Sequence, residues 1–196
     1  MEKQFHYARA RTDAELEEIG AFRYKCYRAD NLIESRPEKT FLDEYDFVDS
    51  AHNFMMKSAG RIVGSIRLHI LDAQHHSSAT MAAFSDVLMP KMLSGMTMID
   101  GARFAVEPDL GALRLAVARQ TLRIYTRFAN MNAVDYCVAA VVESRLELYR
   151  RLYGFTQMSE PRAYGNLTKQ LALMGVDPRR SGIGAPDDFQ PLAIAG

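Results

Sequence analysis

The run AVDYCVAAVV, at positions 133–142, constrains the fold more than any other segment. It is apolar almost throughout, with Asp135 its only charged residue. A continuous rather than alternating apolar run is typical of a strand that is covered on both faces. Segments with apolar residues at helical spacing precede it at 110–131 and follow it at 143–155. The pattern therefore predicts a sheet whose strands are connected by helices.

Local signals predict the other elements before this run. Thr12 and Glu15 have the spacing of a capping box, which predicts a helix over 13–28. Two extended runs on either side of Ala59-Gly60 predict a β-hairpin, and Pro37 keeps the polar segment before them a loop.

Further elements follow toward the C-terminus. We expect a short helical element in FSDVLMPKML, a strand in MTMIDGARFAVEP that Pro108 closes, and one or two strands in 156–175. The helix over 110–131 should bury one face, and the helix after the apolar strand should end at Gly154. The residues expected on the buried face are Leu115, Ala118, Leu122 and Tyr125.

This order of elements predicts an α/β protein with a central, mixed, twisted sheet flanked by helices. A chain of 196 residues fits one domain, which we expect over 1–177. The Pro- and Gly-rich remainder, 178–196, is expected to be a flexible tail.

Composition excludes several classes of function. The 24 basic residues balance the 24 acidic ones, so we expect no nucleic-acid partner. Two cysteines, Cys26 and Cys137, make no disulfide framework, and no run is long enough to span a membrane, so we expect a soluble, cytoplasmic protein. His75 and His76 are adjacent and lack nearby partners, so we expect no metal site.

Charged residues gather at four places in loops or at strand ends. By itself an exposed Asp100–Arg103 pair is worth only ~0–1 kcal/mol, and an acidic loop is usually solvated. Arg67 lies on a strand between apolar residues, so it needs a partner if its face is buried. The four groups are Arg23 with Tyr27; Asp43, Glu44 and Asp46; Arg67; and Asp100 with Arg103.

Between Ala21 and Gly175 these pieces form an ordered pattern. It consists of an Arg with an aromatic residue four positions later, a D-x-x-D acid pair, G-[ST]-x-R-L, acid-x-x-Arg-[FL]-A-V, and YRRLYGF. The pattern resembles the GNAT-type acyltransferases that use acyl-carrier-protein donors. Two branches fit: N-acyl amino acid synthases of the FeeM type, and acyl-homoserine-lactone (autoinducer) synthases.

The resemblance implies roles for the charged residues. Asp100 is the expected general base beside Arg103, directly or through water; Glu44 is the alternative, because the family usually has Glu where Asp100 stands. Asp43 and Asp46 are expected to bind the substrate ammonium, and Arg67 or Arg103 its carboxylate. Arg23 and Tyr27 should order a lid over the site, and Phe104 should contact the substrate. The backbone N–H groups of Ala105 and Val106 are the expected oxyanion donors.

The donor is expected to be an acyl carrier protein, with no tightly bound cofactor beyond its acyl-phosphopantetheine. GNAT enzymes that use free acyl-CoA carry [RQ]-x-x-G-x-[GA] after this strand, whereas EPDLGALRLAV has one glycine and an acidic Asp109. Arg119, Arg123 and Arg127 are spaced i, i+4, i+8 and offer a basic stripe for carrier docking.

The favoured function is therefore transfer of a medium- or long-chain acyl group from acyl carrier protein to the α-amino group of an amino acid, by direct attack. Contact with a membrane is expected only through the product. Lactone synthases generally carry a Trp a few residues after the Arg–aromatic pair. This chain has no Trp, and Ile33 stands near the position where it would fall. Two alternatives stay open: a lactone synthase that uses S-adenosylmethionine, and a non-catalytic sensor of acyl groups or amino acids.

Overall fold

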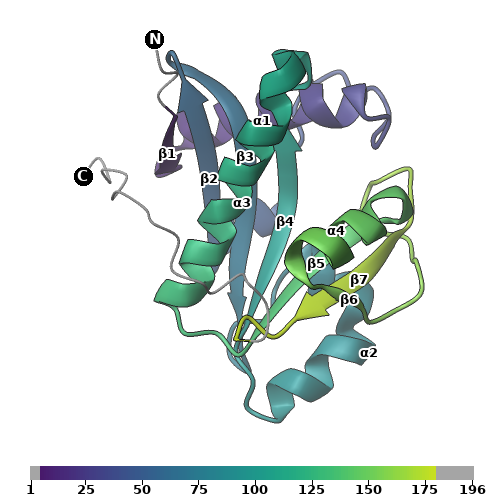
Figure 1. The fold of residues 1–196 in the computed structure, drawn as a ribbon. Coiled ribbons are helices and arrows are strands. Elements are labelled where there is room, and N and C mark those ends of the chain that lie inside the picture. The colour runs from purple at the N-terminus through teal and green to yellow at the C-terminus, as the bar shows by residue number, and fades with distance from the viewer. Residues whose placement is uncertain (1–4, 180–196) are drawn as a thin grey trace.

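The computed structural model describes residues 5–179, which form a seven-stranded mixed sheet covered by helices (Figure 1). The strand order is β1-β2-β3-β4-β5-β7-β6, and only the β4–β5 pair is parallel. The predicted tail lies outside the described residues from 180 onward. The strands are β1 (His6–Arg9), β2 (Ala51–Ser58), β3 (Arg61–Leu71), β4 (Met98–Val106), β5 (Tyr136–Val142), β6 (Thr156–Gln157) and β7 (Leu171–Val176).

Helices cover both faces of the sheet. In Figure 1, α3 and α4 lie in front of the strands and α1 lies behind them. Side chains of α3 pack with one set of alternating strand residues, and side chains of α1 and α2 pack with the other set. The helices are α1 (Asp13–Ala29), α2 (Ala79–Leu93), α3 (Arg114–Met131) and α4 (Leu146–Tyr153), with short 3-10 helices η1 (Glu44–Asp46), η2 (Pro108–Leu113) and η3 (Glu143–Arg145).

Most of the local predictions are confirmed. Thr12 and Glu15 form the capping box of α1, and β2 and β3 form the hairpin around Ala59-Gly60. Gly154 ends α4 with φ 69°, a left-handed conformation that suits glycine. The helix predicted over 84–93 begins earlier, because the Ser78 hydroxyl caps its start.

Two details differ from the sequence prediction. The short edge strand β1 was not expected, and its four mostly exposed residues carry no apolar pattern that would indicate it. Helix α3 buries Val117, Thr121 and Ile124 together with Tyr125, whereas Leu115 is 55% exposed. The predicted face is thus rotated relative to the buried one.

Strands β4 and β5 separate partway along the sheet. Their parallel pairing runs from Met98↔Tyr136 to Gly101↔Ala139 and stops there. The Tyr125 hydroxyl donates to the carbonyls of Ile99 and Val138, one on each strand, within this paired stretch. A Cβ on Gly101 would lie 2.5 Å from the Tyr125 ring, so the glycine makes room for this clamp. Beyond it the two strands diverge.

Among the described residues, no helix is long and apolar enough to cross a membrane. Cys26 and Cys137 are both free thiols and both are buried.

Candidate active site

A β-bulge places Asp100 and Arg103 on the same face of β4. Residues three apart in a regular strand point to opposite faces. Here Arg67↔Ala102 is followed by Ser65↔Ala105, so Arg103 and Phe104 together oppose a single β3 residue. Arg103 adopts a left-handed φ of 53°. The bulge turns the Arg103 side chain toward α1 and leaves Phe104 facing α3.

Three arginines and two aspartates form a buried cluster on this face. Arg23, from α1, donates to Asp46 at 2.7 Å and to Asn53 at 2.8 Å. Arg67, from β3, bridges Asp43 at 2.5 Å and Asp46 at 2.9 Å. Arg23 and Arg67 are completely buried, so these pairings supply the partners that their charges require.

Arg103 joins the cluster through Asp43, which also accepts from Arg67. The Arg103 guanidinium stacks 4.1 Å from the centre of the Phe41 ring. Burial opposes ionisation of Asp43, but the charges of Arg103 and Arg67 outweigh it and lower the pKa of that carboxyl. Three guanidiniums against two carboxylates leave one excess positive charge, and the Nε atoms of Arg67 and Arg103 have no partner.

Asp100 lies on the same face, toward α2, and is completely buried. The Thr80 hydroxyl donates to its Oδ1 atom at 2.8 Å, and its Oδ2 atom has no partner. Burial raises the pKa of Asp100, against the influence of the Thr80 and Ser78 hydroxyl groups and the charges of Arg67 and Arg103. Asp100 is thus a buried carboxyl that binds a proton more readily than an exposed one.

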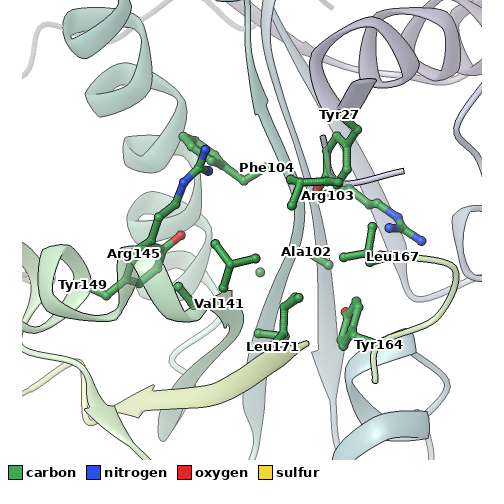
Figure 2. Close-up of a pocket in the computed structure, with 14 residues that line it drawn as sticks. Tyr27, Ala102, Arg103, Phe104, Val141, Arg145, Tyr149, Tyr164, Leu167 and Leu171 are labelled. Atoms are coloured by element: carbon green, nitrogen blue, oxygen red, sulfur yellow. The ribbon is translucent and has the colours of Figure 1, made fainter. Parts of the chain in front are cut away.

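The divergence of β4 and β5 opens a narrow pocket between the strands (Figure 2), called the passage below. Figure 2 shows Tyr164 and Leu167 on one side of it and Val141, Arg145 and Tyr149 on the other. Its lining residues come from α1 and the loop after it, from β4, β5, η3 and α4, and from β7 and the segment that precedes it. They include Arg103 but not Asp100.

A second cavity, of about 230 Å³, lies on the α3 and α4 side. It shares five lining residues with the passage: Tyr27, Leu32, Phe104, Arg145 and Tyr149. Its walls are mainly apolar and include Leu115 and Leu122, so the rotated face of α3 lines this cavity. Three arginines also contribute to its lining: Arg114, Arg119 and Arg145. We call this the α3–α4 cavity.

Backbone N–H groups of β4 point alternately toward β3 and away from it. Glu107 N–H donates to the carbonyl of Val63 on β3 at 2.9 Å. By the alternation of an antiparallel ladder, Ala105 N–H also points to β3, and Val106 N–H points to the opposite edge, where β5 has diverged. Of the two expected oxyanion donors, only Val106 N–H therefore faces the open edge.

The remaining predicted site residues lie in different settings. Tyr27 is buried against Phe41 and lines both cavities. Glu44 is exposed on η1, outside the buried cluster. Asp43 and Asp46 hold arginines, so neither carboxylate is available as the expected ammonium site without displacing one.

The predicted basic stripe on α3 is not uniform. Arg119 is exposed and lines the α3–α4 cavity, whereas Arg123 and Arg127 are partly buried. The Arg127 guanidinium lies 5.8 Å from the Tyr7 ring, over β1. Only the first arginine of the stripe therefore lines the cavity.

Sequence reasoning missed several members of the site. Asn53 and Ser65 both bind Arg23, and the Tyr164 hydroxyl lies 2.9 Å from that of Thr80. Asn53 stands inside the apolar run of the predicted hairpin, and a polar residue there could have indicated a buried partner. Tyr164 lies in an irregular segment with no pattern to mark it.

Within residues 5–179, no group of three or more His, Cys, Asp or Glu side chains is arranged to hold a metal ion. His75 is exposed and pairs with Asp72.

The family model described as N-acyl amino acid synthase FeeM matches residues 18–177. Among solved structures, FeeM, an N-acyl amino acid synthase from uncultured soil microbes, is 16% identical with a TM-score of 0.75, over 91% of this chain and 93% of that chain.

Two autoinducer synthases are also similar. The AHL synthase LasI is 17% identical, with a TM-score of 0.61 over 88% of this chain and 89% of that one. The CoA-dependent acyl-homoserine lactone synthase BjaI is 18% identical, with a TM-score of 0.62 over 91% and 85%. At such identities the likeness shows the fold alone, and the predicted GNAT-like α/β fold is confirmed. No curated protein sequence matches the chain.

Proposed function

The chain belongs to the FeeM family of N-acyl amino acid synthases, and from this membership we propose that it transfers a fatty acyl group from a carrier thioester to the α-amino group of an amino acid. The observation that carries the proposal is the passage between β4 and β5. It has the excess positive charge of the arginine cluster at one wall and joins the α3–α4 cavity through shared residues.

The acceptor amino acid binds from the α1 and α2 side. Its carboxylate pairs with Arg103, which lines the passage and has an unpartnered Nε atom. Asp43 and Asp46 hold the arginines in place rather than contacting the ammonium group. The Phe41 ring stacks on the Arg103 guanidinium and fixes its plane, and Tyr27 packs against Phe41.

The donor arm enters from the other side, through the α3–α4 cavity. Its apolar walls suit a pantetheine arm and the start of an acyl chain, and Arg119 suits its phosphate. Arg114 and Arg145 also line the cavity, and both pair with Asp30, at 3.3 and 2.8 Å. A carrier protein, with a single phosphate on that arm, fits better than free CoA. A CoA pyrophosphate would need free backbone N–H donors at the start of η2. The acidic side chains of Glu107 and Asp109 lie there, and Glu107 already accepts from the Asp109 N–H.

The chemistry is direct attack by the amine on the thioester carbonyl, with Asp100 as the general base. The C–N bond forms, Val106 N–H stabilises the oxyanion, and the C–S bond breaks to release the carrier thiol. Neither cysteine serves as a nucleophile, because burial raises the pKa of both Cys26 and Cys137 to about 12. Exposed Glu44 is then not needed as a base.

The proposal is tested by thiol release from a C16 acyl carrier protein, with pooled amino acids and separately with S-adenosylmethionine. Release that depends on an amino acid supports it. Release only with S-adenosylmethionine would assign the protein to the lactone branch. Release with acyl-CoA but not with carrier protein would overturn the donor, and no release with any pair would leave the sensor as the better account.

A further inference from the structure

Asp100 is separated from the passage in which its substrate would bind. It is completely buried and is absent from the residues that line the passage, although its neighbours Gly101, Ala102 and Arg103 all line it. A general base must exchange a proton with the reacting nitrogen, directly or through intervening groups. Asp100 can therefore act as the base only if intervening groups connect its carboxyl to the passage.

Two hydroxyl groups connect Asp100 to the passage wall. Thr80 Oγ1 donates its hydrogen to Asp100 Oδ1 at 2.8 Å, and it lies 2.9 Å from the Tyr164 hydroxyl oxygen. A threonine hydroxyl has one hydrogen, so Tyr164 donates to Thr80 when Asp100 is ionised. Tyr164 lines the passage, and its oxygen retains a lone pair to accept a further hydrogen bond.

We propose that Tyr164, Thr80 and Asp100 form a proton relay that takes a proton from the substrate ammonium in the passage and stores it on the buried carboxyl. This inference rests on the proposed function. Tyr164 is the catalytic residue of the relay, because its oxygen touches the ammonium, and Thr80 carries the proton between Tyr164 and Asp100.

The transfer balances at each atom. The ammonium gives a proton to Tyr164 oxygen, the Tyr164 proton moves to Thr80, and the Thr80 proton moves to Asp100. Both hydroxyls are neutral before and after, and the substrate becomes a neutral amine. When the amide forms, its nitrogen loses a second proton to the departing thiolate sulfur. Asp100 then returns its proton along the relay to water.

The surroundings favour storage of a proton at Asp100. Its Oδ2 atom lacks a hydrogen-bond partner, and the carboxyl is completely buried between β4 and α2. Burial also raises the pKa of Tyr164, which keeps its hydroxyl neutral. The charged and titratable groups that face Asp100 are Arg67 and His69 from β3, Arg103 from its own strand and Tyr164, whereas Tyr125 of α3 lies across the sheet on its other face.

Thr80 provides the sharpest test, because Thr80→Val removes the hydroxyl and keeps the shape. In the thiol-release assay we expect kcat to fall by about 100-fold or more, with KM for the amino acid little changed. The rate of the variant should keep rising with pH, since only amine that is already neutral reacts. Thr80→Ser restores the hydroxyl and should recover kcat. Tyr164→Phe should lose kcat as Thr80→Val does, and its KM for the amino acid should also rise because the Tyr164 oxygen contacts the ammonium.

Thr121→Val is the matched control. Thr121 is also completely buried, and its hydroxyl donates to Val117 within α3, away from Asp100. This variant measures the effect of losing a buried hydroxyl alone, and its kcat and pH profile should match those of the wild type.

The outcomes separate the relay from the reaction that it serves. If the wild type transfers acyl groups but Thr80→Val keeps its kcat and pH profile, the relay is overturned and the proposed function stands. If Thr80→Ser is as impaired as Thr80→Val, Thr80 is structural and the relay is overturned. A wild type that transfers to no amino acid would overturn both.

Discussion

Arg103 contributes to the site both through its backbone conformation and through its side chain. Its left-handed φ of 53° creates the bulge that turns its side chain toward Asp43, and that side chain then stacks on Phe41. Left-handed backbone costs an L-residue other than glycine about 1–2 kcal/mol. Strain of this kind persists where the surrounding contacts enforce it. The site thus depends on a backbone conformation that its own side chain does not favour.

Comparing Arg103→Gly with Arg103→Ala isolates this strain. Both variants lose the guanidinium and its contacts, but only alanine keeps the unfavourable φ. We expect Arg103→Gly to have a free energy of unfolding about 1 kcal/mol higher than Arg103→Ala, measured by urea denaturation. Equal stabilities would mean that the bulge does not persist without the arginine.

His69 should make stability depend on pH. Burial, followed by the charge of Arg67, lowers the pKa of His69 to about 3, and its Nε2 atom has no partner. The unfolded chain binds a proton near pH 6.5 and the folded protein does not, so this contribution is present at neutral pH and is lost as pH falls from 6.5 toward 3. At pH 5 the loss amounts to about 2 kcal/mol.

The contribution of His69 to the pH dependence of stability is measured by comparing the wild type with two histidine variants. The gap in unfolding free energy between pH 7 and pH 5 should shrink in His69→Gln and stay unchanged in the exposed control His75→Gln. An unchanged gap in His69→Gln would show that this histidine is already charged in the folded protein.

At the scale of elements, the separation of β4 and β5 creates the site, and Tyr125 fixes where it begins. Its hydroxyl bonds one carbonyl on each strand, and Gly101 leaves room for its ring. The bulge in β4 lies between Ala102 and Ala105, just beyond Gly101, the last β4 residue that pairs with β5. The clamp therefore holds the strands together up to the residue at which the passage opens.

Tyr125→Phe should lower the free energy of unfolding by about 1–3 kcal/mol, because it removes a buried donor to two carbonyls. Hydrogen exchange should also accelerate at the β4–β5 pairing more than at the β5–β7 pairing. Tyr153→Phe, in the neighbouring α4, is the control, since it removes a hydroxyl without separating these strands. Equal exchange at the two pairings would argue against a clamp.

The elements were largely predictable, and the reasons for the exceptions are physical. Capping residues and Gly154 mark helix ends locally, so those boundaries were found. The bulge at Arg103 depends on the pairing of β3 with β4, which residue order does not record. The rotated face of α3 arises because Leu115 lines a cavity instead of the core. Tyr164 reaches the site from an irregular segment, whose path only the folded chain reveals.

At the scale of the whole molecule, the passage can be reached from either face of the sheet. The arginine cluster and Asp100 lie on the α1 and α2 face, and the α3–α4 cavity lies on the other. In our account the amino acid enters from the first side and the donor arm from the second. Changes on one side should therefore alter the kinetics of one substrate only.

Arg119→Glu tests this division. It places a negative charge in the α3–α4 cavity, so KM for the acyl carrier protein should rise about tenfold at low salt, with KM for the amino acid unchanged. Arg61→Glu, the same change at another exposed arginine beside the β2–β3 turn, should alter neither. A rise in KM for the amino acid would contradict separate entrances.

The most direct test of the central claim is the mass of the product formed by the purified protein from C16 acyl carrier protein and ¹⁵N-labelled amino acids. We expect a labelled product with the mass of the acyl chain joined to one amino acid with loss of water. Asp100→Asn should form it far more slowly. A labelled product formed equally fast by Asp100→Asn, or no labelled acyl product from the wild type, would contradict that claim.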